Sequence, residues 1–137
     1  MWPQTFDARL ASWTFLREQC QALPVESALV RINDWWFRTP WQPYYLHWDD
    51  QLTWPDPWQL LSDNVYCEVA RGLGILYTIT LLDRADMAPA HLVLTDAGHN
   101  LVLVTKEKYI LNWNAASIVN TIQAGTIQQQ YQQPSIA

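Results

Sequence analysis

A chain of 137 residues is long enough for one domain with a hydrophobic core and too short for two ordinary domains. Half of the residues are apolar and only 15% are charged, a balance that excludes a disordered chain. The net charge of −5, the scattered basic residues and the lack of a long uninterrupted apolar run in the sequence argue against nucleic acid or a membrane as a partner.

Two helices are expected at the N-terminus. Apolar residues recur at helical spacing over residues 7–22, and Pro24 interrupts the pattern. A second amphipathic pattern covers residues 24–38, with Pro24 at a plausible first helical position.

Residues 39–64 are expected to form an ordered loop that is rich in aromatic rings. The stretch TPWQPYYLHWDDQLTWPDP contains four prolines, which interrupt regular hydrogen bonding, and five tryptophan or tyrosine rings, which favour burial. Such a loop is expected either to line a cleft or docking surface, or only to cover the core.

A buried central helix is expected over residues 65–82. Apart from Glu68 and Arg71, the run VYCEVARGLGILYTITLL is apolar on every side. Gly72 and Gly74 each cost about 1 kcal/mol in a helix interior, so their presence predicts close approach of another backbone.

Beyond residue 89 the pattern becomes extended. The runs AHLVLTD, NLVLV and KYILNW, separated by the turn-like AGH and KEK, predict three antiparallel strands. A short helix is possible at residues 115–122. The glutamine-rich end after it is too polar to hold itself in place, so we expect it to be loose or held by a partner.

These elements predict a single α+β domain over residues 1–137, in which N-terminal helices and a buried central helix pack on a small antiparallel sheet. Its parts are the N-terminal helices (1–38), the aromatic loop (39–64), the central helix with the strands (65–114) and the tail (115–137).

Cys67 is a candidate nucleophile. It and Cys20 are expected to be reduced thiols, because nothing marks the chain as secreted. With Asn64 as the N-cap, Cys67 falls in the first helical turn, where the positive helix end favours the thiolate, although the neighbouring Glu68 acts against this. The alternative is that Cys67 is a small core residue, since free cysteines are among the most buried residues.

His99 is the best placed of the three histidines to act as the base. It begins a strand just after a turn, where its ring can lie over the end of a packed helix. If Lys106 and Glu107 form a two-residue hairpin loop, His99 faces Asn114, and Asn112 is diagonal on the same face. Either amide would then orient the imidazole, whereas a three-residue loop places Asn112 on the opposite face.

This order of a helix cysteine, a strand histidine and an amide at the end of the next strand resembles the transglutaminase-like branch of the papain superfamily. The segments WPDPWQLL, YCEVA, HNLVLV and YILN are similar to those of bacterial transglutaminase-like cysteine proteinases, over residues 54–114. The resemblance implies Cys67 as nucleophile, His99 as base and Asn112 in the position of the family's aspartate.

Two features depart from that family. The residues NVY stand where a Gly-Asp segment is usual before the cysteine, and Asn112 cannot stabilise an imidazolium by charge, so turnover would be slow. The oxyanion hole would use the Cys67 backbone N–H and a second donor, either Gln59 or Trp54. No metal or cofactor is expected, because the cysteines, histidines and acids lack standard ligand spacing.

A second resemblance covers the segments LPVESALVRINDWWFRTPW and WPDPWQLLSDNVYC, which are similar to those of small proteins of large tailed bacteriophages. It implies a virion component of the neck, tail or baseplate, made in the host cytoplasm, whose partners are other virion proteins or copies of itself. A domain of this size is not expected to bury all nine tryptophans, so we expect partner contacts at Trp35, Trp36, Trp41 and Trp48.

Three functions are compatible with the sequence. A structural protein that kept a thiol-hydrolase fold, with absent or weak catalysis, predicts a shielded Cys67. An active Cys-His-Asn peptidase, amidase or acyl transferase predicts the Cys67 sulfur within hydrogen-bond reach of a His99 ring nitrogen. A binding module for sugars or peptides predicts a row of exposed tryptophan rings.

Overall fold

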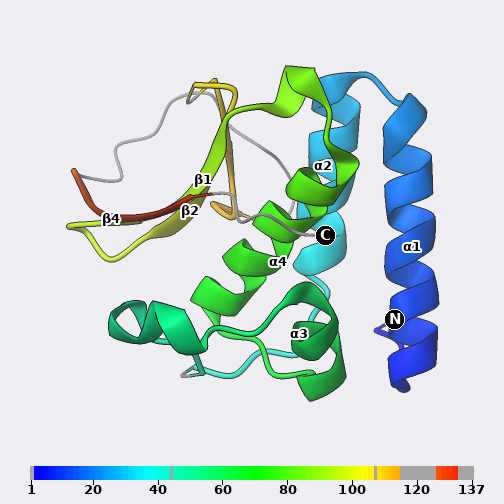
Figure 1. Ribbon diagram of the computed structural model, residues 1–137, viewed down its shortest axis with the longest axis horizontal. Helices are drawn as coiled ribbons and strands as arrows, with labels where there is room; N and C mark the ends of the chain where they lie inside the picture. Colours follow the sequence, from blue (N-terminus) through cyan, green and yellow to red (C-terminus); the bar gives the residue numbers. More distant parts are fainter. Residues whose placement is uncertain (1, 44, 107, 115–125, 133–137) are drawn as a thin grey trace.

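The computed structural model describes residues 2–43, 45–106, 108–114 and 126–132 (Figure 1). Its helices are α1 (Phe6–Ala22), α2 (Val25–Trp36), α3 (Pro57–Asp63) and α4 (Glu68–Leu82), with two 3₁₀ helices, η1 (Trp48–Thr53) and η2 (Ala85–Met87). Its strands are β1 (Ala90–Thr95), β2 (Asn100–Val104), β3 (Tyr109–Leu111) and β4 (Ile127–Gln132). The expected α+β class is confirmed.

Helix α4 lies between the sheet and the pair formed by α1 and α2 (Figure 1). It contacts β1 and β2 on one side and α1, α2 and α3 on the others, and most of its side chains are buried. The expected buried central helix on a small antiparallel sheet is therefore present. None of the described helices is long and apolar enough to cross a bilayer.

The aromatic loop expected over residues 39–64 is in part helical, so this prediction is wrong for η1 and α3. Helix α3 begins with Asp56, whose carboxylate accepts a hydrogen bond from the Gln59 backbone N–H at 2.8 Å, followed by Pro57 at the first helical position. An acidic cap followed by proline is a standard helix start, so the sequence did carry the signal.

The strands pair in the order β3-β2-β1-β4, all antiparallel. Strands β1, β2 and β3 match the three expected from the sequence. Val102 pairs with Leu111 and Val104 with Tyr109, which is the register that a two-residue hairpin loop predicts.

Strand β4 corrects the expectation that the tail is loose or held by a partner. It pairs with β1 along residues 127–132, and Tyr131 packs against the ring of Trp54 with the centroids 5.0 Å apart. Backbone hydrogen bonds to an existing sheet edge do not require apolar side chains, and Ile127 and Tyr131 supply the apolar contacts. The helix considered at residues 115–122 lies outside the described residues.

The core is organised around the hydroxyl group of Thr78. The indole N–H groups of Trp13 and Trp36 both donate to this oxygen at 2.9 Å, and the hydroxyl donates to the Gly74 carbonyl. A Cβ atom at Gly74 would lie 2.4 Å from the Trp36 ring, and one at Gly72 would meet a leucine side chain of β1. The two glycines thus leave room for the side chains of Trp36 and Leu92. They do not mark the close approach of a second backbone, as the sequence suggested.

Three of the four tryptophans expected at a partner surface belong to the core of this chain. Trp35, Trp36 and Trp48 are 8%, 1% and 9% exposed, because the helices and the sheet enclose them. They offer no surface to a partner in this structure. Trp41 is 61% exposed and remains available.

Candidate functional site

Cys67 is the N-cap residue of α4. Its sulfur accepts a hydrogen bond from the Ala70 backbone N–H at 3.5 Å, and its side chain is 3% exposed. The expected capping by Asn64 is wrong, because Asn64 adopts a left-handed conformation (φ 56°) and ends α3 instead. Cys67 and Cys20 are both free and buried.

His99 directly precedes β2. Its ring packs edge-on against the Trp113 ring with the centroids 4.8 Å apart. The Glu68 carboxylate accepts a hydrogen bond from the Asn100 backbone N–H at 3.0 Å, so the residues that follow Cys67 and His99 are joined directly.

The fold therefore brings the cysteine and histidine segments together. Within the described part of the chain, however, no hydrogen bond joins the Cys67 thiol to the His99 ring.

Asn112 is committed to four hydrogen bonds. Its side-chain oxygen accepts from Arg71 Nε at 2.6 Å, and its amide nitrogen donates to the carbonyls of Glu68 at 3.1 Å and Asn100 at 2.8 Å. Its backbone N–H donates to the side chain of Asn33 at 2.9 Å. A carboxamide has two N–H donors, so the Asn112 amide is fully used in joining α4 to β2.

Asn114, the alternative orienting residue, is exposed, and its carbonyl accepts a hydrogen bond from the Asn33 side chain at 2.8 Å. The register that places it opposite His99 is present between β2 and β3. Strand β3 ends at Leu111, before that position.

Arg71 is a neighbour of the site that the sequence did not single out. Its guanidinium stacks on the Phe37 ring, with Cζ 3.8 Å from the centroid. Burial lowers the pKa of Arg71, while the nearby Glu68 and Cys67 oppose this shift. An arginine inside an otherwise apolar helix was the available signal.

Tyr45 and Asp63 form a second polar pair near Cys67. The tyrosine hydroxyl donates to the Asp63 carboxylate at 2.7 Å. Burial raises the pKa of Tyr45, and its bond to Asp63, with smaller effects of Asp63 and Cys67, raises it further. This pair was also not expected, because Tyr45 lies in the aromatic loop, where no helical or strand period predicts which side chains meet.

The two residues considered for an oxyanion hole have other partners. The Trp54 indole has one N–H group, and it donates to the His47 carbonyl at 2.9 Å. The Gln59 amide donates to the Asp63 carboxylate at 2.6 Å from the exposed side of α3. Among the described residues, no group of three or more His, Cys, Asp or Glu side chains is arranged to hold a metal ion.

No protein-family model matches the chain, and comparisons with curated proteins and with solved structures find no significant match. The class of the protein is therefore defined by its own geometry. It is an α+β domain in which a cysteine caps the central helix beside the strand that follows a histidine.

Proposed function

We propose that this chain is a structural, non-catalytic component of a bacteriophage particle, in the neck, tail or baseplate, built on a thiol-hydrolase-like arrangement. The absence of catalysis is inferred from the hydrogen bonds of Asn112, which join α4 to β2. An orienting residue must accept a hydrogen bond from the histidine ring, but among the described residues the Asn112 oxygen accepts only from Arg71 and not from His99. The phage setting rests on the sequence resemblance.

The environment of Cys67 supports the same proposal. Its sulfur is shielded and accepts the N–H of Ala70, so it serves α4 as a cap. A nucleophile needs a base within hydrogen-bond reach, and the His99 ring packs on Trp113.

Alkylation of Cys67 by iodoacetamide across pH tests the proposal. We expect a slow reaction that His99→Ala leaves unchanged. Cys67→Ala is the control, because it reports labelling of the buried Cys20. A fast reaction with a low apparent pKa that His99→Ala raises would contradict the absence of catalysis.

The virion setting is tested separately. We expect mass spectrometry of gradient-purified particles of the encoding phage to detect the chain in a fixed ratio to the other structural proteins. Its loss from the particles during purification would refute a structural role there.

An active thiol hydrolase is the second candidate. It is favoured by the bond between Glu68 and Asn100, which holds Cys67 and His99 in neighbouring segments at the start of α4. The alkylation experiment distinguishes the two functions.

A sugar- or peptide-binding platform is not supported by the exposed rings. Trp41, Trp58 and Trp113 are 61%, 39% and 36% exposed. Within the described ranges, these three rings make no contact with one another, since Trp58 packs on Trp13 and Trp113 on His99.

A further inference from the structure

Two different surfaces lie toward opposite ends of the long axis of the molecule. The 3₁₀ helix η1 lies at the lower left of Figure 1, below the ends of the strands, and the α1–α2 pair lies toward the right. The η1 surface presents an exposed leucine next to two aspartates, and the α1–α2 surface contains a hollow lined in part by an arginine.

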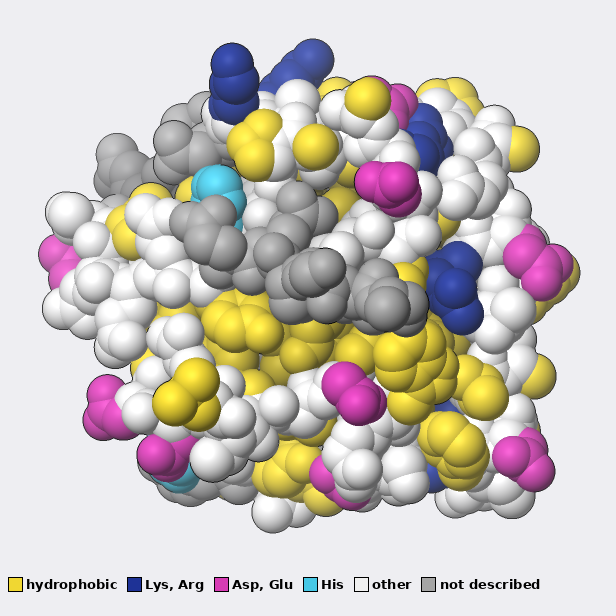
Figure 2. All heavy atoms as spheres, viewed as in Figure 1, with side chains coloured by type: hydrophobic (Ala, Val, Ile, Leu, Met, Phe, Trp, Pro, Cys, Tyr) yellow, Lys and Arg dark blue, Asp and Glu magenta, His cyan; other side chains and the backbone are white. Residues whose placement is uncertain are grey.

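The η1 surface presents a fully exposed leucine. Leu52 is 103% exposed, the highest value among the exposed large apolar side chains. Asp49 and Asp50 lie beside it in the chain and are also exposed. Neither carboxylate has a hydrogen bond or an ion pair with any described residue. Figure 2 shows acidic side chains at this end and others spread over the rest of the face.

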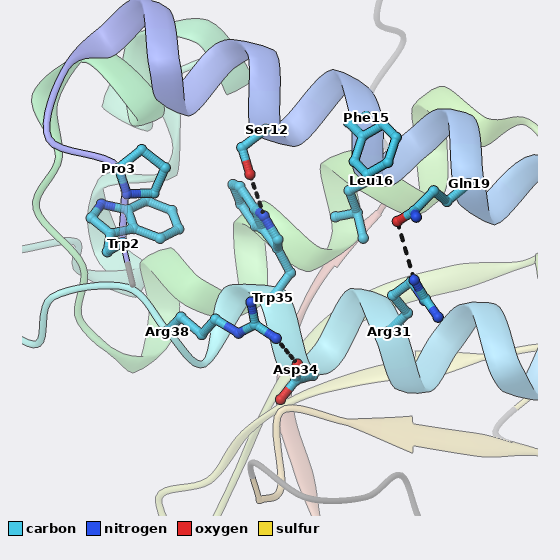
Figure 3. A pocket seen from close by; sticks show the side chains of 10 residues that line it. All are labelled: Trp2, Pro3, Ser12, Phe15, Leu16, Gln19, Arg31, Asp34, Trp35 and Arg38. Atoms are coloured by element: carbon cyan, nitrogen blue, oxygen red, sulfur yellow. Dashed lines mark hydrogen bonds and ion pairs between the residues drawn. The ribbon is translucent and has the colours of Figure 1, made fainter.

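The α1–α2 surface contains a hollow of about 300 Å³ (Figure 3). Leu16 and Trp35 lie in it between the two helices, and Phe15 stands on its rim, 60% exposed. The Trp35 indole donates to the Ser12 hydroxyl at 3.0 Å, which fixes the ring in place. Leu16 and Trp35 are only 3% and 8% exposed, so the apolar surface that the hollow offers to another molecule is chiefly the Phe15 ring on its rim.

Arg31 supplies a positive charge to this hollow. Its only described partner is the neutral Gln19 side chain, at 3.2 Å across the two helices. The neighbouring Arg38, in contrast, is paired with Asp34. The Arg31 guanidinium thus keeps donors and a charge available for a carboxylate.

We propose that η1 of one copy of this chain docks at the α1–α2 hollow of a second copy. Leu52 packs against Phe15 at the rim of the hollow, and an aspartate of η1 pairs with Arg31. Because the two surfaces differ and lie toward opposite ends, the contact is heterologous and propagates into a ring or a filament. The inference rests on the proposed structural role, but its tests involve neither Cys67 nor His99.

Sedimentation velocity of the full chain, from about 10 µM to about 1 mM, tests the contact. We expect the mean mass to rise beyond that of a dimer with concentration. Leu52→Asp and Phe15→Asp each abolish this rise, and both sites are exposed, so the fold is retained, as circular dichroism checks. Trp41→Asp, another exposed apolar site, is the control and leaves the rise unchanged.

Mixing the two variants tests the direction of the contact. Leu52→Asp keeps its hollow and Phe15→Asp keeps its η1, so an equimolar mixture forms a 1:1 dimer and nothing larger. A wild-type chain that stays monomeric throughout or stops at a dimer would overturn the proposal. So would variants that assemble normally, or a mixture without a dimer.

Charge reversal tests the pairing with Arg31. We expect Arg31→Asp to weaken assembly at least about threefold, and the combination with Asp49→Arg and Asp50→Arg to restore it. Lys106→Asp makes the same charge change at an exposed hairpin residue and has no such effect. Equal weakening by Lys106→Asp, or no recovery in the combined variant, would overturn the pairing.

Discussion

The Thr78 hydroxyl group is the acceptor for two buried indole rings at once. Trp13 and Trp36 come from different helices, and both donate to it at 2.9 Å. Thr78 itself is fully buried, so no water replaces the hydroxyl when it is removed. One oxygen atom on α4 therefore fixes the positions of α1 and α2.

Thr78→Val keeps the shape of the side chain and removes this acceptor. We expect a loss of about 2–4 kcal/mol in the free energy of unfolding, because two buried N–H groups lose their partner. Urea denaturation measures the loss. Thr53→Val is the control, since its exposed hydroxyl bonds only the local Asp50 carbonyl. A loss below about 0.5 kcal/mol would show that the indoles find other acceptors.

Gly74 is required by the ring of Trp36. We expect Gly74→Ala to lower the free energy of unfolding by about 1–3 kcal/mol, because the new methyl group meets a ring that Thr78 holds in place. Gly72→Ala is the matched comparison. Its methyl group meets the end of the Leu92 side chain and lies 3.1 Å from the Asn112 amide nitrogen, but no rigid ring stands in its way, so the loss in thermal or urea unfolding should be smaller. The opposite order would contradict this account.

At the scale of elements, the C-terminal ends of α1 and α4 cap each other. Arg84, just beyond α4, donates to the carbonyls of Cys20 and Leu23 at 2.7 Å. In return, Gln21 of α1 donates to the Leu82 carbonyl at 3.0 Å. These bonds satisfy carbonyl groups that a helix end leaves without an internal partner.

Asp86 makes this junction sensitive to acid. It accepts two hydrogen bonds from Arg84, which hold the pKa of Asp86 below its ordinary value. A carboxyl group with a lowered folded pKa stabilises the fold above its unfolded pKa of about 4, and this stabilisation is lost as the pH falls through the folded pKa.

We therefore expect the wild type to be more stable than Asp86→Asn at neutral pH, and the difference to shrink as the pH falls below the unfolded pKa of about 4. Urea unfolding of both proteins across this range measures it. A difference that does not depend on pH would show that the charge of Asp86 is not involved.

Elements with a clear apolar pattern were predictable from the sequence. The helices near residues 7–22 and 24–38 follow an apolar period, whereas the central helix and the first three strands are recognised as one long and three short apolar runs. Strand β4 was not predictable, because its glutamines join the sheet through the backbone. The start of α4 was misplaced by three residues, because Asn64 adopts a left-handed conformation, which no apolar pattern reveals.

For the candidate site, the sequence predicted the order of segments but not the partners of each side chain. The hairpin register and the neighbouring placement of the segments with Cys67 and His99 follow from local patterns. The bond from Arg71 to Asn112 spans 41 residues of sequence and depends on two side-chain conformations. Such a contact is fixed only when the whole domain has packed.

At the scale of the whole molecule, Asn112 connects the two layers. It bonds Asn33 of α2, both Glu68 and Arg71 of α4, and Asn100 of β2. It is 3% exposed and has a positive φ of 68°, a conformation that asparagine tolerates. A residue in this position holds the helix layer to the sheet.

Asn112→Asp distinguishes a structural residue from a catalytic one. In a Cys-His-Asp triad the aspartate would speed alkylation of Cys67. In the structure, the change removes two donors and places a carboxylate against the carbonyls of Glu68 and Asn100, with only Arg71 to compensate. We expect a loss of about 2–4 kcal/mol in the free energy of unfolding and no faster alkylation below the unfolding transition.

The matched control is Asn64→Asp. Asn64 also has a positive φ, and its side-chain oxygen accepts the Trp2 indole N–H at 2.7 Å, a role that a carboxylate retains. It should therefore unfold nearly as the wild type does. The difference between the two variants reports the loss of the Asn112 amide donors together with the burial of its new charge, because backbone conformation is the same in both but only Asn112 is buried. If Asn112→Asp were as stable as Asn64→Asp and accelerated alkylation, the amide would be a replaceable triad member and the non-catalytic role would fail.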